Sequence, residues 1–267
     1  MVLSKLKMAA IAALTFAAVS CSNDTDSMDQ PATLTVNLTD APGDYQEVNI
    51  DVQDVMISTE DGGWESLANV NAGVYNLLDF TNGLDTLLTS SDMPAQSISQ
   101  IRLMLGSNNT VMIDSVVYDL DTPSAEQSGL KLNVHAELEA GQEYAIWLDF
   151  DAGKSIVETG SGSYKLKPVI RTYTQAVTGT IQGSVCLIDS TVYIELTDQD
   201  GVTYGTYADT ETGDYQINGL APGTYSITAS AGEGYTTAQA SDATVVAGET
   251  QIVEEICLSS STTDETY

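Results

Sequence analysis

Apolar and polar residues alternate in one short segment after another along this chain, and turn-forming residues separate the segments. In the first such segment, Leu34, Val36 and Leu38 alternate with Thr35 and Asn37. Successive side chains of an extended strand point to opposite faces, so this period of two predicts a strand with one buried face. Because the pattern recurs along the chain, it predicts an all-β fold class.

The strands expected in the first 173 residues share this alternation and lie at residues 34–38, 48–52, 55–57, 101–105, 130–138 and 144–150. The apolar phase shifts between Val52 and Val55. A single extra residue in one strand produces such a shift, so a β-bulge is expected near residues 53–54.

Two further local patterns differ from the strand alternation. Residues 40–44 (DAPGD) are typical of a turn. Leu84, Leu87 and Leu88 have helical spacing. One short helix is therefore expected within residues 83–90.

The length of 267 residues predicts about two domains. Hydrophobic residues make up 42% of the chain, which is enough for each half to bury a core. We therefore expect two tandem β-sandwich domains, at residues 32–173 and 179–259. A brief linker at 174–178 would join them, and a disordered tail at 260–267 would follow.

The start of the chain has the order of an export signal. Lys5 and Lys7 precede an apolar run from Met8 to Val19, and small Ser20 then precedes Cys21. This order predicts a secretory signal peptide at residues 1–20 with a lipoprotein-type cleavage site. The apolar run has 12 residues, fewer than the ~20 of a membrane-spanning helix. Lipid on the Cys21 thiol would anchor the chain to a membrane. The alternative is an ordinary secretory signal with an incidental cysteine.

Acidic residues dominate the charge of the chain, since 38 Asp and Glu against 8 Lys and Arg give a formal net charge of −30. This sign disfavours nucleic acid as a partner, so none is expected, and it also disfavours anionic lipid headgroups. No Lys or Arg follows Arg171. The acidity fits either a solvated surface or cation binding. Residues 21–31 are polar and acidic without apolar periodicity, so they are expected to form an acidic tether.

The first predicted domain resembles a known family through five ordered motifs, at residues 36–42 (VNLTDAP), 99–103 (SQIRL), 128–132 (SGLKL), 148–156 (LDFDAGKSI) and 164–171 (YKLKPVIR). Together they are similar to the bacterial lipoprotein domain of unknown function numbered 4382. The resemblance implies a surface or periplasmic setting. The expected location is the cell envelope of a Gram-negative-type bacterium, with the lipid anchor in the outer membrane. It supplies no activity and no catalytic residue.

The second predicted domain has a distinctive order of glycine, proline and tyrosine, carried by Gly213, Tyr215, Leu220, Pro222, Gly223, Tyr225, Ile227, Gly234 and Tyr235. It resembles the carboxypeptidase-regulatory-like and collagen-adhesin B-type modules, which share a transthyretin-like sandwich grouped with starch-binding-like folds. The resemblance implies a stalk or spacer, in some cases a binding module, and not catalysis. The tyrosines are expected to pack over the core.

Few residues of the chain are suited to catalysis. His135 is the single histidine and shares the polar face of its strand, so a His-Glu-x-x-His metal site is excluded. Asp149 and Asp151 flank Phe150 on one face of their strand. They could act as an acid and a base, or they could belong to a turn at the strand end. We expect the chain not to be an enzyme.

The two remaining cysteines are expected to form a disulfide. Cys186 and Cys257 are both out of phase with the apolar positions of their strands, on the first and last strands of the second domain. Both thiols therefore point away from the core, and an exported chain permits a disulfide. The alternative is two free thiols, because geometry cannot be judged from spacing.

Acidic turns and exposed rings are candidates for ligand binding in the second domain. The acidic set, which invites Ca²⁺ through its hard oxygens, comprises Asp198, Asp200, Asp209, Glu211 and Asp214. Asp-x-Asp-Gly turns also occur without metal, so no cofactor is expected unless calcium binds. The rings that could stack on sugars are Tyr193, Tyr204, Tyr207 and, from the first domain, Trp147. Each is also an ordinary strand residue.

These patterns lead to one functional hypothesis and one alternative. The hypothesis is a non-catalytic, lipid-anchored cell-envelope protein with an adhesion, scaffolding or display role. The alternative is a carbohydrate-binding surface lipoprotein. The expected partners are the membrane, through the lipid on Cys21, and a polysaccharide or protein at the envelope.

Overall fold

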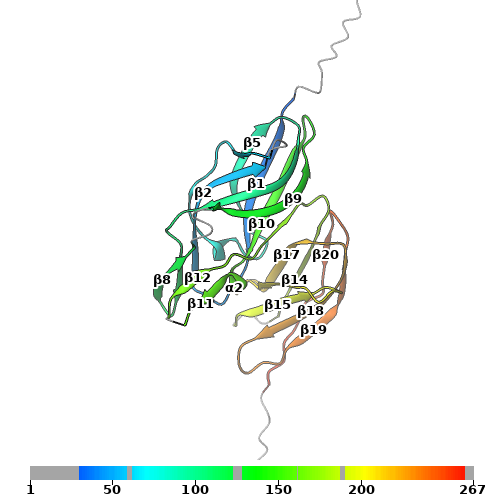
Figure 1. Cartoon of the computed structure of the whole chain (residues 1–267). Coiled ribbons are helices and arrows are strands. Elements are labelled where there is room, and N and C mark those ends of the chain that lie inside the picture. Colours follow the sequence, from blue (N-terminus) through cyan, green and yellow to red (C-terminus); the bar gives the residue numbers. More distant parts are fainter. Residues whose placement is uncertain (1–29, 59–61, 123–127, 161, 187–189, 262–267) are drawn as a thin grey trace, which may run out of the picture.

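The computed structural model describes residues 30–58, 62–122, 128–160, 162–186 and 190–261. The predicted signal peptide, Cys21 and most of the tether lie outside the described residues, as does the end of the tail from residue 262. Within the described residues the chain is nearly all β, which confirms the predicted fold class (Figure 1). No described helix is long and apolar enough to cross a membrane.

Strands β1 to β13 form the first unit, and its described elements include a 3₁₀ turn and a short α-helix. The elements are β1 (Ala32–Ala41), β2 (Glu47–Ser58), β3 (Trp64–Ser66), β4 (Gly73–Asn76), η2 (Leu77–Phe80), β5 (Thr86–Met93), β6 (Ser97–Leu105), β7 (Thr110–Ile113), β8 (Val116–Asp121), β9 (Leu130–Glu137), β10 (Glu143–Asp151), α2 (Ala152–Ser155), β11 (Ile156–Glu158), β12 (Tyr164–Leu166) and β13 (Ile170–Tyr173).

Two sheets pack face to face in the first unit. One has four strands in the order β13-β10-β1-β5, and the other has nine, with β2 at its centre. Buried residues of both sheets share one hydrophobic core, which is how a β-sandwich excludes water. Leu34, Val36 and Leu38 are fully buried, as their alternation predicts.

The β2 strand contains the predicted bulge, since its register with β6 shifts between Val52 and Asp54. The short helix expected within residues 83–90 is wrong. That segment enters strand β5, which pairs with β1 along most of its length. Leu88 is buried while Leu84 and Leu87 are exposed, so the leucines do not form one helical face. Cross-strand pairing therefore overrides a helical pattern that only three leucines support.

Strands β14 to β20 form the second unit around a separate core. They are β14 (Gly179–Ser184), β15 (Val192–Thr197), β16 (Thr203–Tyr207), β17 (Asp214–Leu220), β18 (Gly223–Ala231), β19 (Ala238–Val245) and β20 (Thr250–Ile252). The sheet order is β17-β14-β20 in one layer and β16-β15-β18-β19 in the other. Tyr215 and Tyr225 are almost completely buried in this core, as predicted.

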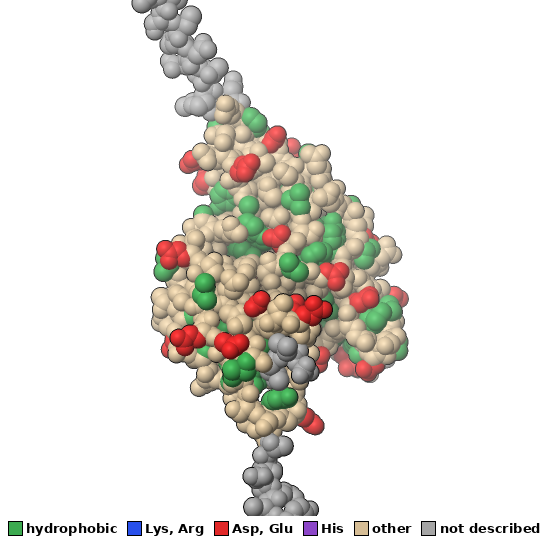
Figure 2. Space-filling view, turned by 180° about the vertical axis from the view of Figure 1, so that it is seen from behind, with side chains coloured by type: hydrophobic (Ala, Val, Ile, Leu, Met, Phe, Trp, Pro, Cys, Tyr) green, Lys and Arg blue, Asp and Glu red, His purple; other side chains and the backbone are tan. Residues whose placement is uncertain are grey.

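Cys186 and Cys257 form the disulfide that their phase predicts, with 5.0 Å between their Cα atoms. Both residues are exposed, and the neighbouring Val185 and Ile256 form a parallel bridge. Hydrogen-bonded structure continues past residue 259, the predicted end of the second domain, because the Ser261 N–H donates to the Gly234 carbonyl at 2.8 Å. On the face shown in Figure 2, acidic side chains are scattered over both units rather than gathered in one patch.

Candidate functional site

Two neighbouring strands end together at the junction of the units. Strands β1 and β10 are parallel, with Thr39 opposite Asp149 and Ala41 opposite Asp151. The carboxyl ends of parallel strands meet at the same edge of a sheet. This register brings Asp40, Asp149 and Asp151 together, although Asp40 lies more than a hundred residues before the other two. The turn expected at residues 40–44 begins later than predicted, because β1 continues to Ala41.

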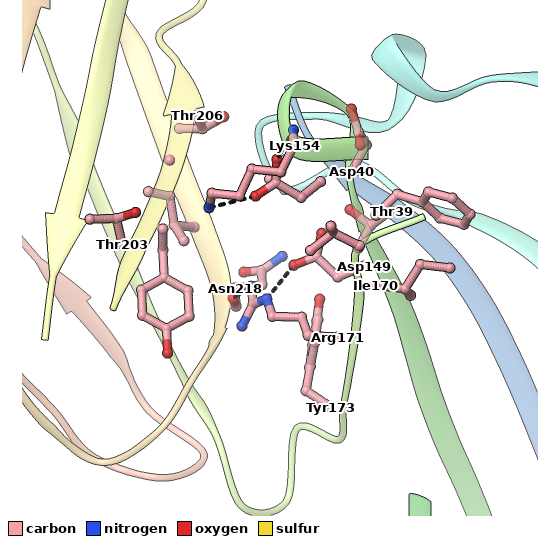
Figure 3. Close-up of a pocket in the computed structure, with 18 of the residues that line it drawn as sticks. Thr39, Asp40, Asp149, Lys154, Ile170, Arg171, Tyr173, Thr203, Thr206 and Asn218 are labelled. Carbon is pink, nitrogen blue, oxygen red and sulfur yellow. Dashed lines mark hydrogen bonds and ion pairs between the residues drawn. The ribbon is translucent and has the colours of Figure 1, made fainter. Parts of the chain in front are cut away.

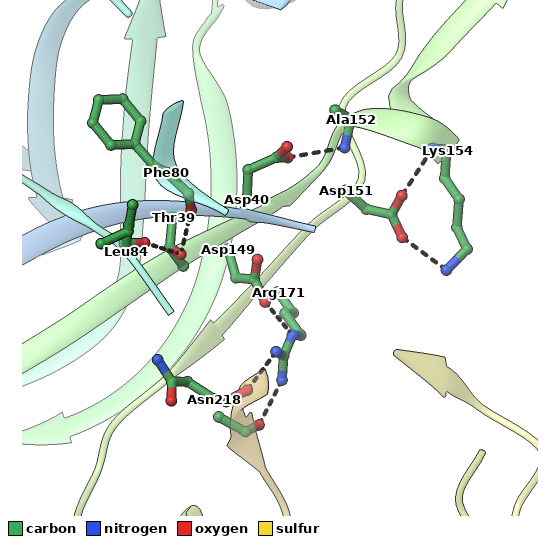
Figure 4. Close-up of polar contacts among 11 residues, drawn as sticks. Thr39, Asp40, Phe80, Leu84, Asp149, Asp151, Ala152, Lys154, Arg171 and Asn218 are labelled. Atoms are coloured by element: carbon green, nitrogen blue, oxygen red, sulfur yellow. Dashed lines mark hydrogen bonds and ion pairs between the residues drawn. The ribbon is translucent and has the colours of Figure 1, made fainter. Parts of the chain in front are cut away.

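Arg171 links the two units at this edge. It lies opposite Asp149 in the antiparallel pair of β10 and β13. Its Nε donates to Asp149 Oδ2 at 2.6 Å, while Nη2 donates to the Asn218 carbonyl at 2.7 Å and Nη1 donates to the Gly219 carbonyl (Figure 4). One guanidinium therefore satisfies a buried carboxylate of the first unit and two backbone carbonyls of the second.

Asn82 forms a second link between the units. Its Nδ2 donates to the Asp214 carbonyl at 3.1 Å, and its Oδ1 accepts from the Gln216 N–H at 2.6 Å. The side-chain amide thus pairs with the edge of β17 as a neighbouring strand would. Two such polar links at one junction favour a single orientation of the units.

A cavity of about 300 Å³ lies between the units at this junction (Figure 3). The first unit supplies the ends of β1 and β10, Lys154 of α2, and part of β13; the second supplies parts of β16 and β17. The volume is at the lower end of the ~300–1,000 Å³ range of small-molecule sites. The lining mixes carboxyl, amide, hydroxyl and aromatic groups.

Burial controls the charge of the carboxyl groups in the cavity. Desolvation raises the pKa of Asp40 well above its ordinary value, and the nearby Asp149 raises it further. Desolvation also raises the pKa of Asp149, but the Arg171 guanidinium opposes that shift. Asp151 accepts the Lys154 N–H at 2.9 Å and forms an ion pair with Lys154 Nζ at 2.7 Å. Asp149 and Asp151 thus each have a cationic partner, whereas Asp40 has none within the part of the chain that the structure describes.

Two buried polar atoms in the cavity wall have no hydrogen-bond partner among the described residues. Asp40 Oδ1 accepts the Ala152 N–H at 3.0 Å, but Asp40 Oδ2 is unpartnered. Thr206 Oγ1 is unpartnered as well. Asp40 is 6% exposed and Thr206 is 2% exposed. Buried polar groups are nearly always paired, so these two atoms are the exceptional feature of the cavity.

The structure brings one of the predicted stacking rings into the cavity wall. Tyr204 lines the cavity, with its ring edge-on to Tyr225 at 5.9 Å. Tyr193 and Tyr207 pair with each other across β15 and β16, with centroids 5.2 Å apart. Each of these rings already has an aromatic neighbour.

Trp147, the fourth predicted ring, belongs to the first unit. It stacks on Tyr173 at 5.6 Å, and its Nε1 donates to Asp85 Oδ2 at 2.6 Å. The Arg171 guanidinium carbon lies 5.2 Å from the Tyr173 ring centroid and 5.0 Å from that of Tyr204. Arg171 therefore lies between an aromatic pair of the first unit and one of the second, and cation–π attraction adds to its hydrogen bonds.

The acidic turns of the second unit do not come together as one site. Asp198 Oδ1 accepts the N–H groups of Asp200 and Val202, and Asp209 Oδ1 accepts those of Glu211 and Thr212. Backbone hydrogen bonds hold the pKa of Asp209 below its ordinary value, led by the bond from Thr212. Within the described ranges, no group of three His, Cys, Asp or Glu side chains is placed to hold a metal ion.

The sequence predictions missed the residues that distinguish this cavity. His135 is exposed on β9, as its strand phase predicts. Asp149 and Asp151 reach the cavity. Asp40 and Arg171 lie in the motifs at residues 36–42 and 164–171, but those motifs supply no site residue, and Thr206 has no signal in its neighbourhood. The one available hint was that Arg171 is the last cation in an acidic chain. A cation at that position is well placed to contact the second unit, which contains no Lys or Arg.

Three solved structures show the extent of similarity to known proteins. The shaft pilin SpaA from Lactobacillus rhamnosus GG has 11% identity over 88% of this chain and 100% of that chain, with a TM-score of 0.23. CBMbc (family CBM26) from Eubacterium rectale Amy13K, solved in complex with maltoheptaose, has 16% identity over 87% and 98%, with a TM-score of 0.23. The Bacillus anthracis TIE protein has 9% identity over 86% of this chain, with a TM-score of 0.25.

Similarity at this level carries no information about what the chain binds. The chain spans about a third of the TIE protein, namely 34% of its length. None of the curated proteins compared with the chain matches it in sequence. A family model does match residues 31–168, more than half of the chain and nearly all of the first unit. The chain therefore belongs to the family described as "Domain of unknown function (DUF4382)".

Proposed function

We propose that the protein is a non-catalytic, lipid-anchored cell-envelope protein with an adhesion, scaffolding or display role. The signal pattern ending at Cys21 supports the anchor, and the acidic segment after it supports a tether. Strand β1 begins at Ala32, directly after the proposed tether. The outer membrane of a Gram-negative-type bacterium is the proposed location. The second unit is proposed to be a carboxypeptidase-regulatory-like module.

The observation that carries this proposal is the set of polar and aromatic contacts that join the two units. Arg171 and Asn82 bind backbone groups of β17 from the first unit, and the ring pairs flank Arg171. A protein that displays a surface away from a membrane benefits when its distal unit keeps one orientation. A flexible linker without such contacts would let the second unit turn freely.

The anchor is tested by expressing the full chain in a Gram-negative host and comparing it with the Cys21→Ser variant. The unchanged chain should incorporate labelled fatty acid and stay in the membrane fraction. Cys21→Ser should lose the label and leave the membrane. A matched Ser20→Ala variant keeps a small residue before the cysteine and should behave as the unchanged chain. Equal membrane association of the Cys21→Ser variant would contradict lipid anchoring.

The alternative function is a carbohydrate-binding surface lipoprotein. The observation that favours it is the cavity between the units, which combines the Tyr204 ring with hydroxyl and amide groups. Binding to a polysaccharide panel, first with calcium and then with chelator, tests it. Tyr204→Ala should abolish binding, whereas Tyr235→Ala, which lies outside the cavity, should not. Loss of binding in chelator would show a metal requirement, and absence of binding in both conditions would reject the alternative.

A further inference from the structure

The cavity between the units contains two buried oxygens that the protein leaves without hydrogen bonds. Asp40 Oδ2 and Thr206 Oγ1 both belong to its lining and come from opposite units. Leaving a buried polar atom without a partner carries the full desolvation cost of that atom. A bound molecule with its own hydroxyl groups would supply the missing partners.

The charges that line the cavity balance one another. The Asp149 carboxylate is neutralised by Arg171, and that of Asp151 by Lys154. Asp40 lacks a cation, and its burial favours the uncharged carboxylic acid. Apart from Asp40, the charged side chains of the lining form two ion pairs, although the whole chain has a formal charge of −30. An anionic ligand would be repelled by the protein as a whole, and two of the three carboxylates of the lining already have cationic partners for which a cationic ligand would have to compete.

Hydrogen bonding defines the ligand more closely. A protonated Asp40 has one donor to offer through Oδ2, because Oδ1 already accepts from Ala152. The Thr206 hydroxyl can donate and accept. Asn218 and Gln216 add amide groups to the same lining, and Tyr204 adds an apolar ring. Such a set suits a compact molecule that bears several hydroxyl groups around an apolar ring or chain.

We propose that the cavity between the two units binds a small, uncharged, hydroxyl-rich molecule, either a single sugar ring or a comparable polyol, through the side chains of Asp40 and Thr206. This inference rests on the carbohydrate-binding alternative and specifies its site. It does not depend on the lipid anchor or on the display role. A sugar ring can reach the cavity free or at the end of a glycan, and the probes below distinguish these sources.

The test is isothermal titration of the full-length protein, purified in detergent, with single probes. The uncharged probes are glucose, galactose, mannose and myo-inositol, the charged probes are glucuronate and glucosamine, and maltoheptaose represents a longer glycan. At least one uncharged probe should bind, and its glucuronate or glucosamine counterpart should bind more weakly. Tighter binding of maltoheptaose than of glucose would point to a glycan end as the source. Binding of none of these probes, or stronger binding of a charged one, would overturn the proposal.

Variants of Thr206 separate ligand binding from folding. Thr206→Val has the same shape without the hydroxyl, so it should weaken binding at least tenfold, equivalent to about 1.4 kcal/mol. Because the Thr206 hydroxyl is unpartnered in the free protein, this variant should melt no lower than the unchanged chain. Thr206→Ser should retain binding. Thr228→Val, on β18 of the same sheet and outside the lining, is the control and should change nothing.

A variant of Asp40 tests whether that side chain acts as a hydrogen-bond donor, as a protonated carboxyl group would. Asp40→Asn keeps an oxygen for the Ala152 N–H and offers an amide N–H in place of the acid O–H. Binding of the uncharged probe should therefore stay within about threefold of the unchanged chain. Unchanged binding in Thr206→Val, or loss of binding in Asp40→Asn with an intact fold, would contradict the assigned roles. Membrane association through Cys21 should be the same in all variants, so the two proposals can fail separately.

Discussion

Arg171 forms hydrogen bonds with both units, to Asp149 of the first and to two backbone carbonyls of the second. If it is replaced by alanine, Asp149, which is 6% exposed in the unchanged chain, loses its ion pair, and two carbonyls of β17 lose their donor. Removing one partner of a buried charged pair is costly, and one-third exposure of the Arg171 side chain moderates the cost. We expect Arg171→Ala to lower the free energy of unfolding by about 2–3 kcal/mol, as measured by urea denaturation.

Lys154→Ala is the matched control for the Arg171 variant. Lys154 also pairs with a cavity aspartate, but 56% of its side chain is exposed. An exposed ion pair is worth about 1 kcal/mol or less. A destabilisation in Arg171→Ala no larger than that in Lys154→Ala would contradict the structural role of Arg171.

Asp40 gives the protein a specific pH dependence. Burial raises the pKa of Asp40 above its value of 3.8, so the folded state binds this proton more tightly than the unfolded state does. The resulting stability is fully present below about pH 4 and is lost as the pH rises through the folded pKa. Asp40→Asn does not titrate. The unfolding free energy of the variant relative to the unchanged chain should therefore increase with pH.

Urea unfolding of both proteins from about pH 4 to about pH 9 measures this difference. Titratable groups remote from Asp40 are present in both proteins, so their contributions cancel, whereas the charges of Asp149 and Asp151 act on Asp40 and contribute to the difference. A difference that stays constant over this range would show that Asp40 is ionised in the folded protein. A difference that decreases with pH would show that folding lowers the pKa of Asp40 instead of raising it.

Local sequence could not identify Asp40, although it did identify its strand. The residues DAPGD are typical of a turn, and nothing near them shows that a strand more than a hundred residues later lies alongside. The burial of Asp40 follows from that parallel pairing and from the second unit. The alternation within one strand was sufficient to predict that His135 and the two cysteines are exposed, because it decides which face of the strand each side chain is on.

At the scale of elements, the alternation of apolar and polar residues was a good predictor of strands, whereas a short helical spacing was a poor predictor of a helix. The bulge in β2 left a phase shift that could be seen in the sequence. The leucines at 84, 87 and 88 gave a helical spacing over less than two turns, too short to compete with pairing along β1. The true 3₁₀ turn, η2, is started by Asn76, whose side chain accepts the Leu78 N–H.

The disulfide is expected to stabilise the second unit. It joins residues 71 apart, so it restricts a long loop of the unfolded chain. The double variant Cys186→Ser and Cys257→Ser should lose about 2–4 kcal/mol in urea denaturation. Both residues are exposed, so the serines leave no cavity in the core. An unchanged unfolding midpoint in reducing agent would show that the disulfide contributes nothing.

Gly219 of β17 is expected to be required at the junction. Its φ of +68° lies in the left-handed region, and a Cβ added there would overlap the Tyr173 ring. Gly201 also has a positive φ, of +80°, but a Cβ there would meet nothing within 4 Å. Gly219→Ala should therefore destabilise the protein by ~1–3 kcal/mol, clearly more than Gly201→Ala in the same urea assay. Equal effects would show that backbone strain, and not contact at the junction, is decisive.

At the scale of the whole molecule, the sequence predicted two β units but not their junction. Each core follows from alternation within one half of the chain. The junction depends on single side chains, Arg171 and Asn82, that meet backbone groups of β17. Side chain to backbone contacts place few demands on the partner's sequence, so no pattern in the second unit indicates them. The cavity and its two unpartnered oxygens arise only when the units are assembled.

The fixed junction supports the display role and forms the cavity, so it is the central claim. Residual dipolar couplings of backbone amides, measured on the isotope-labelled full chain in weakly aligning medium, test it directly. One alignment tensor should fit the amides of both units, and Arg171→Ala should require two. Two different tensors for the unchanged chain would show that the units reorient independently, and this result would contradict both the fixed junction and the cavity built from it.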